Sequence, residues 1–218
     1  MSSVVETLDP NGRRVLDVSA LPDSAWDVDS PVWWGNLLLI FIESTTMSLL
    51  LVTYFYLRRN FGAWPPPQSN AFPPLFHPVP DLPIPTIETI MVVLACALMY
   101  ATDQFARKLK RNGTLIGLLI MLLITIAAIV MRFFEFKGVH FRWDDNAYGS
   151  VVWWILCVHL TYLLAAAAEF FIMSVWIIRH GIDSKHGMDV TLAGITWYWL
   201  VGTWVVVYGV IYFGARML

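Results

Sequence analysis

Ionisable side chains inside long apolar stretches are the residues of this 218-residue chain that are best placed to do chemistry. Glu43 lies about 11 residues into the first such stretch, near mid-membrane at about 1.5 Å rise per residue. Its polar neighbours are Ser44, Thr45, Thr46 and Ser48. Two interpretations of Glu43 stay open: a proton-active or lipid-contacting carboxylate, or a protonated carboxyl that hydrogen-bonds to another helix.

His159 lies at a similar depth in a later apolar stretch, and the other histidines fall in predicted loops. A haem ligand would usually need a second axial partner in the membrane. We therefore interpret His159 as a hydrogen-bonded structural residue. Its depth is also compatible with a contact to Glu43.

Four more ionisable residues have simpler structural interpretations. Glu88 opens the second apolar stretch, where a carboxylate in the first turn suits the helix dipole. Arg132 and Glu135 are three residues apart, so they can form an ion pair on one helix face. Glu169 follows four alanines, which indicates close helix packing there.

The composition is that of a membrane protein. Apolar residues make up 58% and charged residues 14% of the chain, against about 45–50% and about 25% in average globular proteins. With a net charge of −2, this excludes a disordered chain, a nucleic-acid binder and an ordinary soluble domain. Eleven Trp and eight Tyr residues suit membrane–water interfaces.

Sequence motifs for catalysis and metal binding are absent. There is no C-x-x-C-H, H-E-x-x-H, phosphate loop or nucleophile elbow. Cys96 and Cys157 fall within apolar stretches and are expected to be packing residues. We therefore predict neither a catalytic residue nor a metal site in this chain.

The apolar pattern predicts an all-α bundle of five transmembrane helices. A polar, acidic tail (1–31) precedes the membrane domain (32–218), and a proline-rich outer loop covers 59–85. The fourth helix is long, so it should tilt or protrude. The predicted spans are 32–57, 84–106, 114–136, 148–178 and 190–214.

The basic cluster in the short loop at 107–111 favours a cytoplasmic N-terminus and an external C-terminus. The tail lacks the basic and apolar regions of a signal peptide. No internal repeat is visible, which removes the usual support for an inverted-repeat transporter.

An ordered set of motifs resembles subunit III of the haem–copper cytochrome c oxidases, in a divergent five-helix bacterial form. The motifs are Glu43 in the first helix, Trp64–Pro67 (WPPP), RFFEF with Glu135, Ala147–Val151 (AYGSV), His159, and the Tyr198–Trp199 pair. The chain departs from the family at several positions. Arg132 replaces a glutamine, Tyr162 a histidine and Glu88 an asparagine, while Leu200 and Thr203 replace the His and Asp of the last helix.

The resemblance implies a non-catalytic subunit of a respiratory chain in the bacterial inner membrane, serving aerobic electron transport. Haem and copper are then expected in partner subunits and not in this chain. The expected partners are subunit I, subunit II, other respiratory-complex subunits and bound phospholipids, with no nucleic acid. Glu43 becomes the family's proton-related carboxylate, and Arg58 and Trp64 become candidate lipid-headgroup contacts.

Two other functions stay open. The same fold serves as a subunit-III-like accessory protein of nitric oxide reductases, and the missing His and Asp of the last helix keep this alternative alive. An independent transporter or proton channel is a third hypothesis. It rests on the intramembrane carboxyls and His159.

Overall fold

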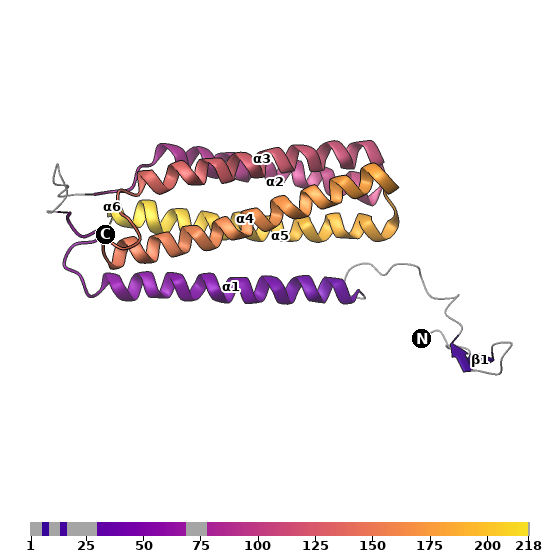
Figure 1. The fold of residues 1–218 in the computed structure, drawn as a ribbon, viewed down its shortest axis with the longest axis horizontal. Helices are drawn as coiled ribbons and strands as arrows, with labels where there is room; N and C mark the ends of the chain where they lie inside the picture. The colour runs from indigo at the N-terminus through magenta and orange to yellow at the C-terminus, as the bar shows by residue number, and fades with distance from the viewer. Residues whose placement is uncertain (1–5, 9–13, 17–29, 69–77, 218) are drawn as a thin grey trace.

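The computed structural model describes residues 6–8, 14–16, 30–68 and 78–217. Five long helices dominate it (Figure 1). They are α1 (Pro31–Arg58), α2 (Pro83–Arg107), α3 (Arg111–Gly138), α4 (Ala147–His180) and α5 (Ser184–Tyr208). A π-helical turn, η2 (Gly209–Phe213), and a short helix, α6 (Gly214–Met217), continue from α5.

The helix ends carry local signals. Proline stands at the start of α1 and α2, where its missing N–H costs nothing. The side chains of Asn146 and Asp183 cap α4 and α5 by accepting hydrogen bonds from backbone N–H groups at 2.8 Å each. Gly181, with φ +83°, ends α4.

All five helices are long and apolar enough to cross a membrane, so the predicted all-α architecture of five spans is confirmed. The predicted spans lie within the observed elements. The fifth ends in η2 and α6, whose π-helical turn the sequence pattern did not indicate.

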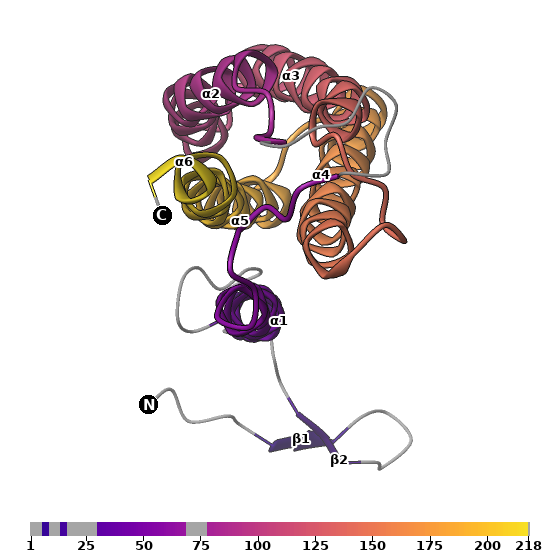
Figure 2. The same ribbon diagram turned by 90° about the vertical axis from the view of Figure 1, so that its left-hand side faces the viewer.

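Helices α2 to α5 form a bundle, and α1 lies outside it against α4 and α5 (Figure 2). α1 is the least buried of the five helices. The 34-residue α4 runs obliquely to α1 (Figure 1). The N-terminus of α1 lies at the same end of the molecule as the α2–α3 and α4–α5 turns (Figure 1).

The close contact of α2 with α3 depends on a glycine. A Cβ at Gly117 would lie 2.2 Å from the Thr102 hydroxyl oxygen on α2, which is closer than any real Cβ contact. Gly117 and Thr102 are both buried. The absence of a side chain at Gly117 therefore sets the spacing of these two helices.

The tail contains a short antiparallel strand pair, β1 (Glu6–Leu8) with β2 (Arg14–Leu16), in which Glu6 is opposite Leu16. The sequence pattern of the tail does not indicate this strand pair. Of the predicted tail, residues 1–5, 9–13 and 17–29 lie outside the described residues, as do residues 69–77 of the proline-rich loop.

Candidate functional site

Arg132 is the centre of a buried polar cluster. Its guanidinium donates to Glu88 Oε1 on α2 over 2.6 Å and to Glu135 on α3. The Tyr212 hydroxyl, on η2, also donates to Glu135. Each of these four side chains is at most 2% exposed, so the cluster is closed off from its surroundings within this chain.

His159 completes the cluster from α4. Arg132 Nη2 lies 3.2 Å from His159 Nδ1, and His159 Nε2 lies 3.3 Å from the Leu200 carbonyl oxygen. A guanidinium can only donate, so Nδ1 accepts and Nε2 carries the proton. Arg132 also lies 3.7 Å over the ring of Trp204. His159 is therefore a neutral, doubly hydrogen-bonded residue in this arrangement.

The structure corrects the interpretation of Glu88. Helix α2 has no acidic residue in its first turn, and Glu88 lies one turn further in. Its carboxyl is buried against Arg132 rather than exposed at the helix end. The dipole explanation was wrong because the sequence cannot show that Arg132 of α3 faces this position. The ion pair between Arg132 and Glu135, predicted from their spacing, is present.

Glu43 lies outside this cluster, half-buried on α1. Its backbone carbonyl lies 3.4 Å from the Tyr162 hydroxyl of α4, which donates to it. The next residue, Ser44, accepts a hydrogen bond of 2.7 Å from the indole N–H of Trp199 on α5. The hydrogen bonds of His159 go to Arg132 and to the Leu200 carbonyl. None of them goes to Glu43, although the two residues were expected at a similar depth.

Glu169 lines a groove of about 730 Å³ between α1, α4 and α5. Asp189 and Asn36 are further polar residues of its lining. Close helix packing was expected at the preceding alanines. Ala166 is buried, but Ala165 and Ala168 line the groove. The groove follows from the oblique course of α4, which diverges from α1 (Figure 1).

Trp64 and Arg58 lie at the opposite end of α1 from this groove. Trp64 packs edge-on against Tyr54 and Tyr148, with ring centroids 5.5 and 5.1 Å apart. It also lines a hollow of about 480 Å³ together with Pro65, Pro67 and Pro78. Its indole nitrogen is buried without a hydrogen-bond partner among the described residues. Arg58 is half-buried at the last turn of α1.

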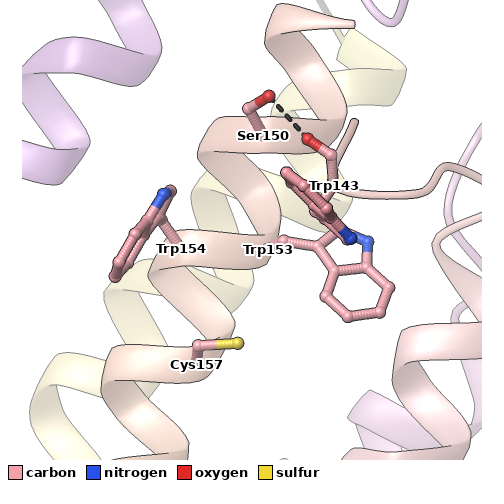
Figure 3. Close-up of a pocket in the computed structure, with 5 residues that line it drawn as sticks. All are labelled: Trp143, Ser150, Trp153, Trp154 and Cys157. Atoms are coloured by element: carbon pink, nitrogen blue, oxygen red, sulfur yellow. Dashed lines mark hydrogen bonds between the residues drawn. The ribbon is translucent and has the colours of Figure 1, made fainter. Parts of the chain in front are cut away.

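A tryptophan-lined pocket at the start of α4 was not singled out from the sequence. It has a volume of about 480 Å³ and is lined by Trp143, Ser150, Trp153, Trp154 and Cys157 (Figure 3). The Ser150 hydroxyl donates to the Trp143 carbonyl over 2.7 Å. The i, i+3, i+4, i+7 spacing from Ser150 to Cys157 was a usable signal for a shared helix face.

The fold and these sites define a multi-pass helical membrane protein with a buried cluster of one arginine and two glutamates inside its bundle. A family model described as cytochrome c oxidase subunit III matches residues 20–216, and the chain belongs to this family. It is similar to the cytochrome c oxidase subunit 3 of Pylaiella littoralis, with 24% identity over 152 residues. That match covers 69% of this chain and 53% of the relative, so the chain spans about half the length of the curated relative.

Proposed function

We propose that this chain is the non-catalytic subunit III of a terminal respiratory haem–copper oxidase in a bacterial inner membrane. Its main partner would be subunit I, with subunit II and other respiratory-complex subunits in the same assembly. Haem and copper would reside in those partners. The observation that carries the proposal is the family match over nearly the whole chain.

The proposed role of this chain is to sustain the partner's turnover through proton uptake, oxygen access and stability. Glu43 supports the first of these because it is a half-buried carboxyl on the helix that packs least against the rest of the chain. The bonds from Tyr162 and Trp199 to α1 fix the position of its backbone. Glu43 is thus held in place and still open on one side to a partner helix or to lipid.

The groove between α1, α4 and α5 is the proposed site of a bound phospholipid. Most of its lining is apolar, including Val32, Leu39 and Ile172, which suits acyl chains. Arg58 and the hollow beside Trp64 are proposed headgroup contacts at the other end of α1. Lipid in the groove would hold α1 against the bundle.

We also propose that the N-terminus faces the cytoplasm. The basic turn between α2 and α3 contains Lys108 and Lys110 and leads into Arg111 at the start of α3, and it lies at the same end as the start of α1 (Figure 1). Positive loops favour the cytoplasmic side.

Deleting this chain from its host and purifying the remaining oxidase tests the proposal. We expect unchanged haem and copper content and a similar initial rate, followed by faster loss of activity during sustained turnover. Supplying the chain again should restore the lifetime. An unchanged lifetime without the chain would contradict the supporting role, and loss of haem would contradict the non-catalytic one. Ion or proton flux through liposomes that contain only this chain would support the transporter hypothesis instead.

A further inference from the structure

The buried cluster around Arg132 contains two carboxyl groups and one cation. Its members come from every element packed around it: Glu88, Arg132, Glu135, His159, Trp204 and Tyr212. With both glutamates ionised, the cluster would carry one uncompensated negative charge. An isolated ionised carboxylate in an apolar interior is costly enough that it takes up a proton instead.

We propose that this cluster is a proton-binding site and that Glu88 holds the proton at neutral pH. The site then consists of ionised Glu135, charged Arg132 and a neutral Glu88 carboxyl. Its net charge is zero. It is distinct from Glu43, and the inference does not depend on the proposed role in the oxidase.

The hydrogen bonds favour Glu88 over Glu135 as the proton carrier. Glu135 accepts from both Arg132 and the Tyr212 hydroxyl, and such bonds stabilise an ionised carboxylate. Glu88 accepts at one oxygen only, while its Oε2 is buried without a partner among the described residues. An unpartnered oxygen is less costly in a neutral carboxyl than in an ionised one.

The other titratable groups near the cluster do not supply a second positive charge. His159 must accept from Arg132, which keeps its ring neutral. Tyr212 donates to Glu135, and the buried Tyr148 is a phenol that carries no positive charge. The exposed Arg216 donates to the carbonyl oxygens of Tyr212 and Pro80, at 2.6 and 2.5 Å, and to neither glutamate, so its charge lies at the surface and not inside the cluster.

Infrared difference spectroscopy of the purified complex tests this site, since a protonated carboxyl has its own C=O band. Bands from all other carboxyls cancel between wild type and variant. Charge balance predicts that Glu88→Gln and Glu135→Gln each lose one such band. Arg132→Gln, which has no cation, should gain a band because both glutamates become protonated. Arg132→Lys keeps the cation and should match wild type, so it is the control.

A second measurement locates the proton. In Glu88→Asp a C=O band should again be present. Its frequency should shift when aspartate is isotope-labelled and should not shift when glutamate is labelled. This variant keeps the carboxyl and serves if Glu88→Gln does not accumulate.

A difference spectrum of Glu88→Gln that shows no lost band would overturn the proposal because Glu88 would then carry no proton in the native cluster. A band that is lost in Glu88→Gln but kept in Glu135→Gln would show that Glu88 stays protonated when Arg132 has no other carboxylate to pair with. That result would overturn the claim that charge balance sets the protonation of the cluster. A Glu88→Asp band that still follows labelled glutamate would place the proton on another residue.

Discussion

The indole N–H of Trp199 on α5 donates a hydrogen bond of 2.7 Å to the hydroxyl of Ser44 on α1. The Trp199 ring also lies edge-on against Tyr162 of α4, with centroids 5.2 Å apart. Tyr162 in turn binds the backbone of Glu43. The three helices α1, α4 and α5 thus meet beside Glu43, a carboxyl that lies outside the Arg132 cluster.

Trp199→Phe should weaken the attachment of α1. An interhelical hydrogen bond in a membrane protein contributes about 0.6 kcal/mol on average, so we expect a small but measurable loss of stability in detergent. Proteolysis or thermal unfolding of the purified complex would measure it. Trp154→Phe, at an exposed position on α4, is the matched control. Equal stability of the two variants would show that the Trp199–Ser44 bond does not hold α1.

Glu43→Ala should leave the haem spectrum and the initial rate of the oxidase unchanged but shorten its active lifetime or alter its proton stoichiometry. The reason is that the cofactors are proposed to reside in partner subunits, while Glu43 is half-buried on α1 of this chain. Turnover assays with pH-electrode recording would measure both quantities. Thr45→Ala, at an exposed neighbour, should behave as wild type. Loss of haem in Glu43→Ala would contradict the supporting role.

Gly117→Val should separate α2 from α3. Its Cβ would collide with the Thr102 side chain, and overpacking of this kind typically costs about 1–3 kcal/mol. We expect a lower midpoint of thermal unfolding. Gly202→Ala on α5, where nothing lies within 4 Å of the added Cβ, should be neutral. A stable Gly117→Val variant would mean that the two helices can shift at little cost.

Ala168→Trp should fill part of the groove between α1, α4 and α5. If the groove holds a phospholipid, mass spectrometry of the intact complex should detect fewer retained lipids. Leu164→Trp lies one turn away at an exposed position of α4 that does not line the groove. It should retain the wild-type number. Equal lipid retention in both variants would argue against the groove as a lipid site.

Asp183→Asn should reduce the dependence of stability on acidic pH. The backbone N–H of His186, and then its ring, lower the pKa of Asp183 from its ordinary value. A carboxyl with a lowered pKa in the fold stabilises the protein at any pH above its ordinary pKa. This stabilisation is lost as the pH falls through the lowered pKa. Asn keeps the helix cap but cannot ionise. Thermal unfolding at neutral pH and in the acid range would test this, with Asp183→Ala as the variant that loses the cap at every pH.

The sequence predicted the helical architecture well, since each span is a continuous apolar stretch bounded by proline, glycine or a capping residue. It also predicted the Arg132–Glu135 pair, because a three-residue spacing fixes two side chains on one helix face. Partners on different helices could not be predicted. Glu88 meets Arg132, and His159 meets Arg132 and Leu200, only through the packing of α2, α4 and α5 around α3.

The groove beside Glu169 and the strand pair β1–β2 are two further features that the local sequence pattern could not predict. The four alanines before Glu169 indicated close packing, but the oblique course of α4 opens the space beside Ala165 and Ala168. Helix crossing depends on all contacts along both helices, which a local pattern does not contain. The three-residue strands β1 and β2 are too short to show a periodic pattern.

Co-purification tests the central claim most directly: that this chain is a subunit of a haem–copper oxidase. The chain would be tagged at its native locus, extracted in mild detergent, and analysed for accompanying polypeptides, visible spectrum and metal content. We predict that haem and copper co-purify on other polypeptides, with oxygen consumption by the complex. Haem without copper would point to the nitric oxide reductase alternative. A folded, colourless chain that comes out alone would contradict the account.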